Sequence, residues 1–238
     1  MNGLLAHCGA ELMTRQNLLE IQTPPGTDTH KPIPHAHLVE TVIQTLGFRN
    51  IEVTRDQYAL TADGMRMFGI IEVNLTRDGV NFTIGLRNSH DKSFSLGMCA
   101  GWRTLVCDNL AFHSDFEALA RKHTKNLVLD EVLGVAIDRV QRAFGMLGQK
   151  LDAWAGFSLS DKDAKVLIYD AFVGERLEAP KHLMRSVNDF YFEPKFEEFK
   201  PRTMLSLNNA FTSAFGLLDP VPMVRATASL AGYLETVN

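Results

Sequence analysis

Hydrophobic positions in the first half of the chain follow a helical spacing first and a strand spacing afterwards. From His35 to Gly47 the apolar residues recur three or four positions apart, which predicts a helix that stops at Gly47. Apolar stretches then predict strands over 51–60, 65–75, 80–86 and 94–106, with Asp-Gly turn signals at 63–64 and 78–79. We therefore expect an α+β fold, built on a four-stranded antiparallel meander flanked by helices.

The remainder of the chain has mainly helical periodicity. Apolar residues three or four apart predict one long helix over 127–155, and Ser160 is a capping residue for a helix through Phe172. Residues 188–202 are aromatic and charged and are expected to be irregular, before helices over 205–217 and 221–236. Residues 22–34 contain four prolines and a glycine, which exclude a regular helix or a central strand.

This pattern divides the chain into three parts. We expect an N-terminal segment with a proline-rich connector (1–34), an α+β core (35–156) and a helical C-terminal region packed on the core (157–238). The 238 residues are 45% hydrophobic and 22% charged, as in ordinary globular proteins. No apolar run approaches the roughly 20 residues that cross a bilayer, and the N-terminus lacks the features of a signal peptide. We expect a cytoplasmic protein with no membrane partner.

The net charge and the cysteine content limit the class of protein further. The net charge of −4 argues against attachment to DNA by bulk charge alone. It does not exclude a local basic groove, because salt screens charges over about 10 Å. The three cysteines, Cys8, Cys99 and Cys107, are irregularly spaced, which fits reduced thiols better than a disulfide framework.

The segment from Arg87 to Ser93 is the first of two polar clusters that follow an apolar stretch. Its Asn, Ser and Asp residues are turn formers, so a purely structural turn is one interpretation. In the other, Arg87, His90 and Lys92 offer donors that suit phosphate groups. His90 with Asp91 could instead form a general-base or metal-binding pair. Adjacent residues on an extended strand point to opposite faces, which weakens this last interpretation.

Cys107-Asp108-Asn109 is the second polar cluster. A helix cap followed by a helical segment is the structural interpretation, and a nucleophilic cysteine is the alternative. Asp108 could also join His90 and Asp91 in a hydrolase or nuclease site. No cofactor and no metal is expected, because only His35-Ala36-His37 has a local spacing that suits a metal and no Cys-x-x-Cys accompanies it.

Basic residues of the N-terminal half favour an anionic partner. Residues 121–125 are the densest basic run and precede the long helix, where the helix dipole disfavours cations. If the arginines of the predicted strands share a face with the first polar cluster, that face is positively charged although the net charge of the chain is negative. The residues expected to contact nucleic acid are Arg66, Arg87, Asn88, His90, Lys92, Arg103, Arg121, Lys122 and Lys125.

Several segments resemble a family of domain-of-unknown-function proteins found on phages, plasmids and other mobile elements. They are Gly64–Gly69, Leu86–Ser93, Gly101–Leu110 and Asn209–Thr212. The resemblance implies a mobile-element setting and supplies no catalytic residue. Antiparallel strands followed by one long helix are also similar to the Rad52-like single-strand annealing proteins, at the level of fold alone. That similarity implies an oligomeric ring that binds single-stranded DNA.

The expected function is a nucleic-acid-binding protein, with single-stranded DNA as its partner, that anneals or protects strands as a homo-oligomer. Glycines 134, 145 and 148 in the long helix would admit a closely packed backbone, and the outer strands need to be covered. One alternative is a metal-assisted hydrolase or nuclease that uses His90, Asp91 and Asp108. Another is an interaction factor that inhibits a host defence protein through residues 188–202.

Overall fold

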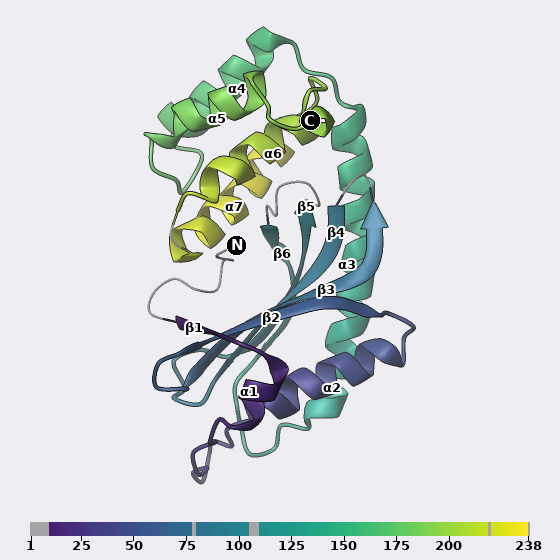
Figure 1. Ribbon diagram of the computed structural model, residues 1–238, viewed down its shortest axis with the longest axis vertical. Coiled ribbons are helices and arrows are strands. Elements are labelled where there is room, and N and C mark those ends of the chain that lie inside the picture. The colour runs from purple at the N-terminus through teal and green to yellow at the C-terminus, as the bar shows by residue number, and fades with distance from the viewer. Residues whose placement is uncertain (1–9, 78–79, 105–109, 219, 238) are drawn as a thin grey trace. The chain divides into compact units, whose positions relative to one another are not determined.

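The computed structural model describes residues 10–77, 80–104, 110–218 and 220–237. The chain forms two compact units (Figure 1). The first unit contains most of a β-sheet, two helices that precede the sheet's second strand, and the long helix up to Gly145. The second contains the rest of the long helix and the helices that follow it. None of the helices in the described ranges is both long enough and apolar enough to cross a lipid bilayer.

Within the described residues, six strands form one antiparallel sheet in the order β1-β2-β3-β4-β5-β6. The strands are β1 (Ala10–Met13), β2 (Val53–Thr61), β3 (Arg66–Arg77), β4 (Val80–Ser89), β5 (Leu96–Thr104) and β6 (Leu110–Arg121). Each strand neighbours the next one in the sequence. Leu12 lies opposite Ala59, and Ala59 lies opposite Phe68, so these three residues form one row across the sheet. The α+β fold class is confirmed.

The predicted turn at Asp63-Gly64 joins β2 to β3. Asp63 Oδ1 accepts a bond of 2.5 Å from the Thr61 hydroxyl and one of 3.0 Å from the Met65 amide. Gly64 has a φ of 66°, in the left-handed region that favours glycine. This turn fixes the residue at which β3 begins. The other predicted Asp-Gly turn, at 78–79, lies outside the described residues.

The sheet has two more strands than the four that were predicted. β1 has only four residues, too few for an alternating pattern to be recognised. β6 begins where a capped helical segment was expected, because polar residues interrupt its sequence Phe112-His113-Ser114-Asp115-Phe116. β1 and β6 therefore form strands because they pair with a neighbouring strand, since the preference of a segment for strand structure depends strongly on its context.

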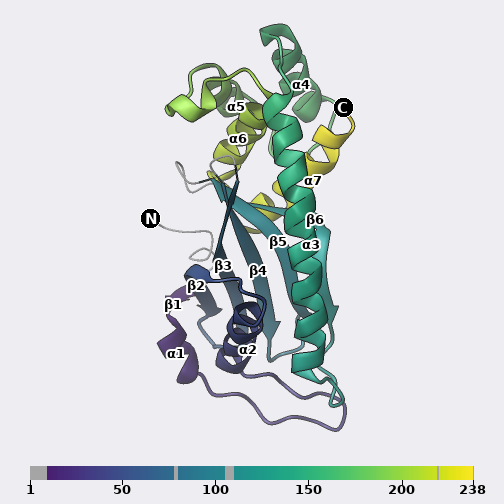
Figure 2. The ribbon, with the colours of Figure 1, turned by 90° about the vertical axis from the view of Figure 1, so that its right-hand side faces the viewer.

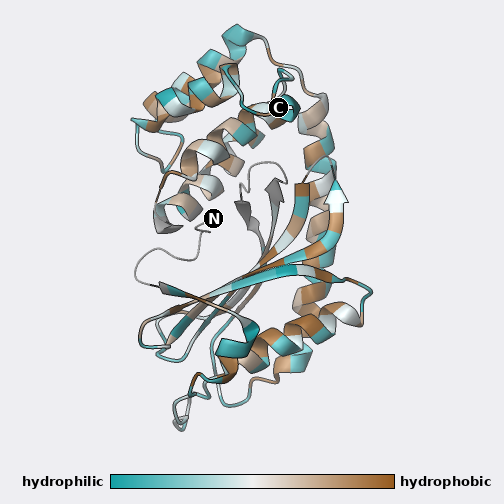
Figure 3. Cartoon of the chain, in the orientation of Figure 1, coloured by the Kyte–Doolittle hydropathy of each residue, from teal (hydrophilic) through white to brown (hydrophobic). Residues whose placement is uncertain are grey.

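Helices of the first unit cover one face of the sheet. They are α1 (Arg15–Leu19), α2 (His35–Gly47) and α3 (Leu129–Gly156) as far as Gly145. Figure 2 shows α2 and α3 on the same side of the strands. The bounds of α2 are those predicted, and it buries Leu38, Val42 and Leu46 while its other side is more polar (Figure 3). Phe82 of β4 stacks on Phe144 of α3 with ring centroids 4.9 Å apart.

The C-terminal part of the chain is helical, as expected. Its elements are α4 (Asp161–Val173), α5 (Leu183–Phe192), the 3-10 helix η1 (Glu197–Phe199), α6 (Met204–Phe215) and α7 (Pro220–Glu235). Ser160 caps α4 by accepting a bond of 3.1 Å from the Asp163 amide. Residues 188–202 are not wholly irregular, because α5 extends to Phe192 and Arg202 bonds to the carbonyl of Tyr191 at 2.8 Å.

The glycines of α3 were expected to admit a closely packed backbone. Arg49 lies over Gly134 and bonds to its carbonyl at 3.0 Å, and a Cβ on Gly148 would lie 2.6 Å from Arg77 Nη1. A Cβ on Gly145 would meet no atom of the described residues within 4 Å. Arginine side chains, rather than another backbone, thus lie against two of these glycines.

Candidate functional site

One end of the sheet gathers most of the residues that were predicted to bind nucleic acid. In the order of this antiparallel sheet, β3 and β5 begin there and β4 and β6 end there. The His90 amide, just after β4, donates to the Met65 carbonyl, just before β3, at 2.8 Å. Candidates from 66, 87–92 and 121–125 therefore meet at this end although they are far apart in the sequence.

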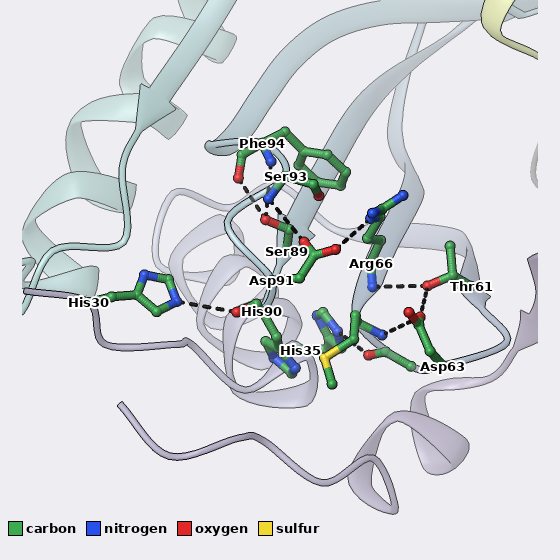
Figure 4. Close-up of polar contacts among 12 residues, drawn as sticks. His30, His35, Thr61, Asp63, Arg66, Ser89, His90, Asp91, Ser93 and Phe94 are labelled. Atoms are coloured by element: carbon green, nitrogen blue, oxygen red, sulfur yellow. Dashed lines mark hydrogen bonds and ion pairs between the residues drawn. The ribbon is translucent and has the colours of Figure 1, made fainter. Parts of the chain in front are cut away.

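The loop after β4 is a well-bonded turn (Figure 4). The Ser89 hydroxyl donates to the Phe94 carbonyl at 2.7 Å and accepts from the Phe94 amide at 3.3 Å. Asp91 Oδ1 accepts from the Ser93 amide at 3.0 Å, and Lys92 has a φ of 64°. Ser89, Asp91 and Ser93 thus stabilise the turn, as the interpretation of this cluster as a structural turn predicts. The side chain of Lys92 is exposed at the tip of the turn.

Asp91 also holds an arginine in place. Arg66 Nε donates to Asp91 Oδ2 at 2.7 Å, and the Arg66 side chain stays 46% exposed. Partial burial opposes ionisation of Asp91, but the bonds from Ser93 and Arg66 outweigh it and lower the pKa of Asp91 to about 2. Asp91 is therefore ionised at neutral pH, and it orients the guanidinium of Arg66.

Two phenylalanines lie beside these arginines on the face of the sheet opposite α2. Phe68 and Phe94, here called the phenylalanine pair, have ring centroids 5.3 Å apart, and Phe68 is 41% exposed. Arg66 precedes Phe68 by two positions on β3, so both point to the same face. The Arg87 guanidinium lies 5.8 Å from the Phe94 ring, within cation–π range.

A glycine makes room for this position of Arg87. A Cβ on Gly97 would lie 2.5 Å from Arg87 Nε and 2.9 Å from its Cγ, so no larger residue fits unless Arg87 moves. The side chain of Arg87 thus lies closely over Gly97. Arg66, the phenylalanine pair and Arg87 therefore lie on the same face of the sheet, with the two rings in contact and Arg87 beside Phe94.

Asn88 follows Arg87 on β4 and points to the opposite face, where it forms the centre of a buried network. Asn88 Nδ2 donates to the Ile33 carbonyl at 2.8 Å and to His35 Nδ1 at 2.9 Å. Asn88 Oδ1 accepts from His123 Nε2 at 2.6 Å. Asn88 is 0% exposed, so these contacts satisfy it inside the protein.

His90 and His30 complete this network, which we call the histidine cluster: His30, His35, His90 and His123 around Asn88. His90 Nε2 donates to the Ile33 carbonyl at 2.9 Å, and His30 Nε2 lies 3.3 Å from the His90 carbonyl (Figure 4). His35 Nε2 donates to the Gly64 carbonyl at 3.0 Å. The rings of His35 and His90 stack at 3.9 Å with an interplanar angle of 10°.

Burial favours the neutral form of three histidines of this cluster: His35, His90 and His123. Burial, together with a smaller effect of the nearby His90, lowers the pKa of His35 to about 4. Burial likewise lowers the pKa of His123 to about 4, with added effects of His30 and His90, and it lowers the pKa of His90. An uncharged imidazole donates from one nitrogen and accepts at the other, which is the pattern that His35 shows.

His90 and Asp91 do not converge on a common point. The His90 ring bonds to Ile33 on the buried side, whereas the Asp91 carboxylate bonds to Arg66 and Ser93. Asp108, the third member of the predicted hydrolase site, lies outside the described residues, as do Cys107 and Asn109. In the described part of the chain, no three His, Cys, Asp or Glu side chains are arranged to hold a metal ion.

The other predicted contact residues fall into three groups. Asn88 and His90 are buried and bond within the protein, and Arg103 lies toward the other end of β5, with its side chain outside the described set. Lys92, Arg121, Lys122 and Lys125 are exposed, and no carboxylate of the described residues forms an ion pair with them. Sequence reasoning missed Phe68, although the alternation Arg66-Met67-Phe68 placed it on the face of Arg66.

Comparison with known proteins gives one match. The family model described as "Domain of unknown function (DUF932)" matches residues 28–213. These residues include the phenylalanine pair and every member of the histidine cluster. Neither the curated proteins nor the solved structures contain a match to this chain.

Proposed function

This chain belongs to the DUF932 family, whose description names no activity, and we propose that it binds single-stranded nucleic acid on the sheet face opposite α2. The observation that supports this most is the phenylalanine pair near Arg66 and Arg87, in which Phe68 is exposed and Phe94 is half-buried. Aromatic rings on an exposed surface stack with unpaired bases, and arginines beside them bind the phosphates.

The arrangement favours a single strand over a duplex. Stacking on Phe68 needs the flat side of a base, which a duplex covers with the neighbouring base pair. Phe94 lies against Phe68 at a tilt of 43°, so the two rings present adjoining surfaces rather than one deep slot. Such a surface accepts any base, because every base has a π-face. We therefore propose binding with little sequence preference.

Exposed cations extend the surface beyond the rings. Lys92 follows Asp91 at the tip of the loop after β4, and Arg121, Lys122 and Lys125 stand at the end of β6. A strand that stacks on the phenylalanine pair would meet these groups at the same end of the sheet. Local positive charge can act in this way despite a net charge of −4, since salt screens the distant acids.

The finer proposal is that this binding serves annealing or protection of strands by a homo-oligomer. Its support is the similarity to annealing proteins that the predicted strands and long helix implied, together with the mobile-element setting that the sequence resemblance implied. Replication and transfer of such elements pass through single-stranded intermediates, which would be the ligand.

Two phenylalanine substitutions test the proposal. Fluorescence anisotropy with a labelled oligothymidine gives the affinity of the wild type, of Phe68→Ala and of Phe48→Ala. Phe48 is a matched control because it is 86% exposed and follows α2, away from the phenylalanine pair. Loss of one stacked base costs about 1–3 kcal/mol, so Phe68→Ala should bind about 5- to 150-fold more weakly. Equal affinities of all three proteins would refute stacking on this surface.

A further inference from the structure

We infer that the histidine cluster is a pH-sensitive latch, which holds the proline-rich connector (22–34) on the end of the sheet while its imidazoles are neutral and releases it when they gain protons. The inference rests on contacts within the first unit and does not depend on the proposed nucleic-acid binding.

The connector is held by bonds that the cluster makes. Its Ile33 carbonyl accepts from both Asn88 and His90, at 2.8 and 2.9 Å. His30 pairs with Thr124 in an isolated antiparallel bridge, in which the Lys31 amide donates to the His123 carbonyl at 3.1 Å. The connector carries no helix and no strand of the sheet, so these bonds and the burial of Ile33 fix this part of it.

The bonds of Asn88 fit only one protonation state of its neighbours. Asn88 presents Nδ2 to His35 and to Ile33, and Oδ1 to His123. A proton on His35 Nδ1 would place two donors against each other. Rotation of the amide by 180° does not relieve this, because Oδ1 would then face the Ile33 carbonyl and Nδ2 would face the donating nitrogen of His123. Protonation therefore breaks the network instead of rearranging it.

Protonation of His90, in addition to that of His35, is also unfavourable. Its Nδ1 is buried and has no hydrogen-bond partner among the described residues, so a proton there would gain no acceptor. The ring stacks on His35, and two protonated rings 3.9 Å apart would repel each other. Asp91 favours the charged form of His90, but its oxygens already bond to Arg66 and Ser93.

The groups that face the cluster come from every segment packed around it. The connector supplies His30, α2 supplies His35, β4 and its loop supply His90 and Asp91, and the segment after β6 supplies His123. Lysines that flank these residues in the sequence add further positive charge: Lys31, Lys92 and Lys122. A positively charged imidazole would thus be repelled by cations on several neighbouring segments. Separation of the connector from the sheet reduces this repulsion.

Hydrogen exchange of the full-length protein tests the latch at a named amide. The Lys31 amide is protected by its bond to His123, so its exchange rate, divided by the intrinsic rate at each pH, reports the closed connector. Between pH 7 and pH 5 we expect at least a tenfold loss of protection at Lys31. Exchange at Lys31 should respond little to added urea, because the connector opens locally, whereas amides in the middle of β3 should exchange through global unfolding, which urea accelerates. Unchanged protection at Lys31, or a urea dependence at Lys31 equal to that in β3, would overturn the inference.

Substitutions that cannot titrate complete the test. In His35→Asn the amide oxygen can accept from Asn88, and in His123→Gln the amide nitrogen can donate to it, so both should shift opening to lower pH. The control is His37→Asn, since His37 is an exposed histidine on the same turn of α2. If His35→Asn alone fails to fold, His123→Gln decides the outcome. An opening pH that is the same in the foldable cluster variant and in His37→Asn would refute the latch.

Discussion

Acidification from pH 7 to pH 5 should weaken the first unit by an amount that the histidine cluster sets. The pKa of His35 and that of His123 are about 4 in the folded protein, below their ordinary value of 6.5. Between these two pH values the unfolded chain binds more protons than the folded one. The stabilisation is therefore fully present above pH 6.5 and is lost progressively as the pH falls toward 4.

The size of the effect follows from the same shift. For His35, which is 1% exposed, linkage gives a loss of about 2 kcal/mol at pH 5 relative to pH 7. His123 acts in the same direction, but both histidines bond to Asn88, so their effects will not simply add. A loss of this size is a large fraction of the roughly 5–15 kcal/mol that stabilises a typical domain. Asp91 does not interfere, because its pKa of about 2 confines its effect to pH values below its ordinary 3.8.

Urea unfolding at pH 7, 6 and 5 measures this loss. The wild type should lose at least about 2 kcal/mol of unfolding free energy, whereas His35→Asn should show a shallower dependence on pH. His37→Asn should behave as the wild type. A wild-type unfolding free energy that is the same at pH 7 and pH 5 would refute the reasoning, and so would equal pH dependences of the wild type and His35→Asn.

Three further outcomes are expected. Gly69→Ala should lower the unfolding free energy by about 1–3 kcal/mol in urea unfolding, because its Cβ would lie 2.9 Å from the buried Tyr58 ring; an unchanged value would contradict this packing. Gly97→Ala should displace Arg87 from Phe94 and weaken binding of oligothymidine at a temperature where the variant is folded; unaltered affinity would show that Arg87 does not contribute to binding. Light scattering should give a mass above the monomer's 26.6 kDa, and a mass of 26.6 kDa with and without single-stranded DNA would contradict annealing by an oligomer.

The parts of the fold that could be predicted are those in which local periodicity and burial agree. α2 has the predicted bounds, and α3 differs by one or two residues at each end, because a stripe of apolar residues dictates each helix. β1 and β6 depend on a neighbouring strand, which no local pattern reveals. α5 was missed because Tyr191 and Phe192 resemble strand or loop residues, although Arg202 holds them at a helix end.

The candidate site was predictable only in part, for a similar reason. The polar cluster at 87–93 was identified correctly as the end of a strand, but not the separation of its members to two faces. Arg87 points to the phenylalanine pair, and Asn88 points to the histidine cluster. The cluster joins His30, near the start of the chain, to His123, and only the completed sheet brings such distant residues together. The spacing of the histidines in the sequence therefore does not predict the histidine cluster.

The salt dependence of binding to single-stranded DNA tests the central claim most directly. Each phosphate contact releases counterions, so the logarithm of affinity should fall linearly with the logarithm of salt concentration, by about 0.7 per contact. If four cations of the proposed surface bind phosphates, the slope is about −3, and Phe68→Ala should lower the affinity at every salt concentration without changing the slope. Absence of binding at low salt, or an affinity that does not change with salt, would contradict the account.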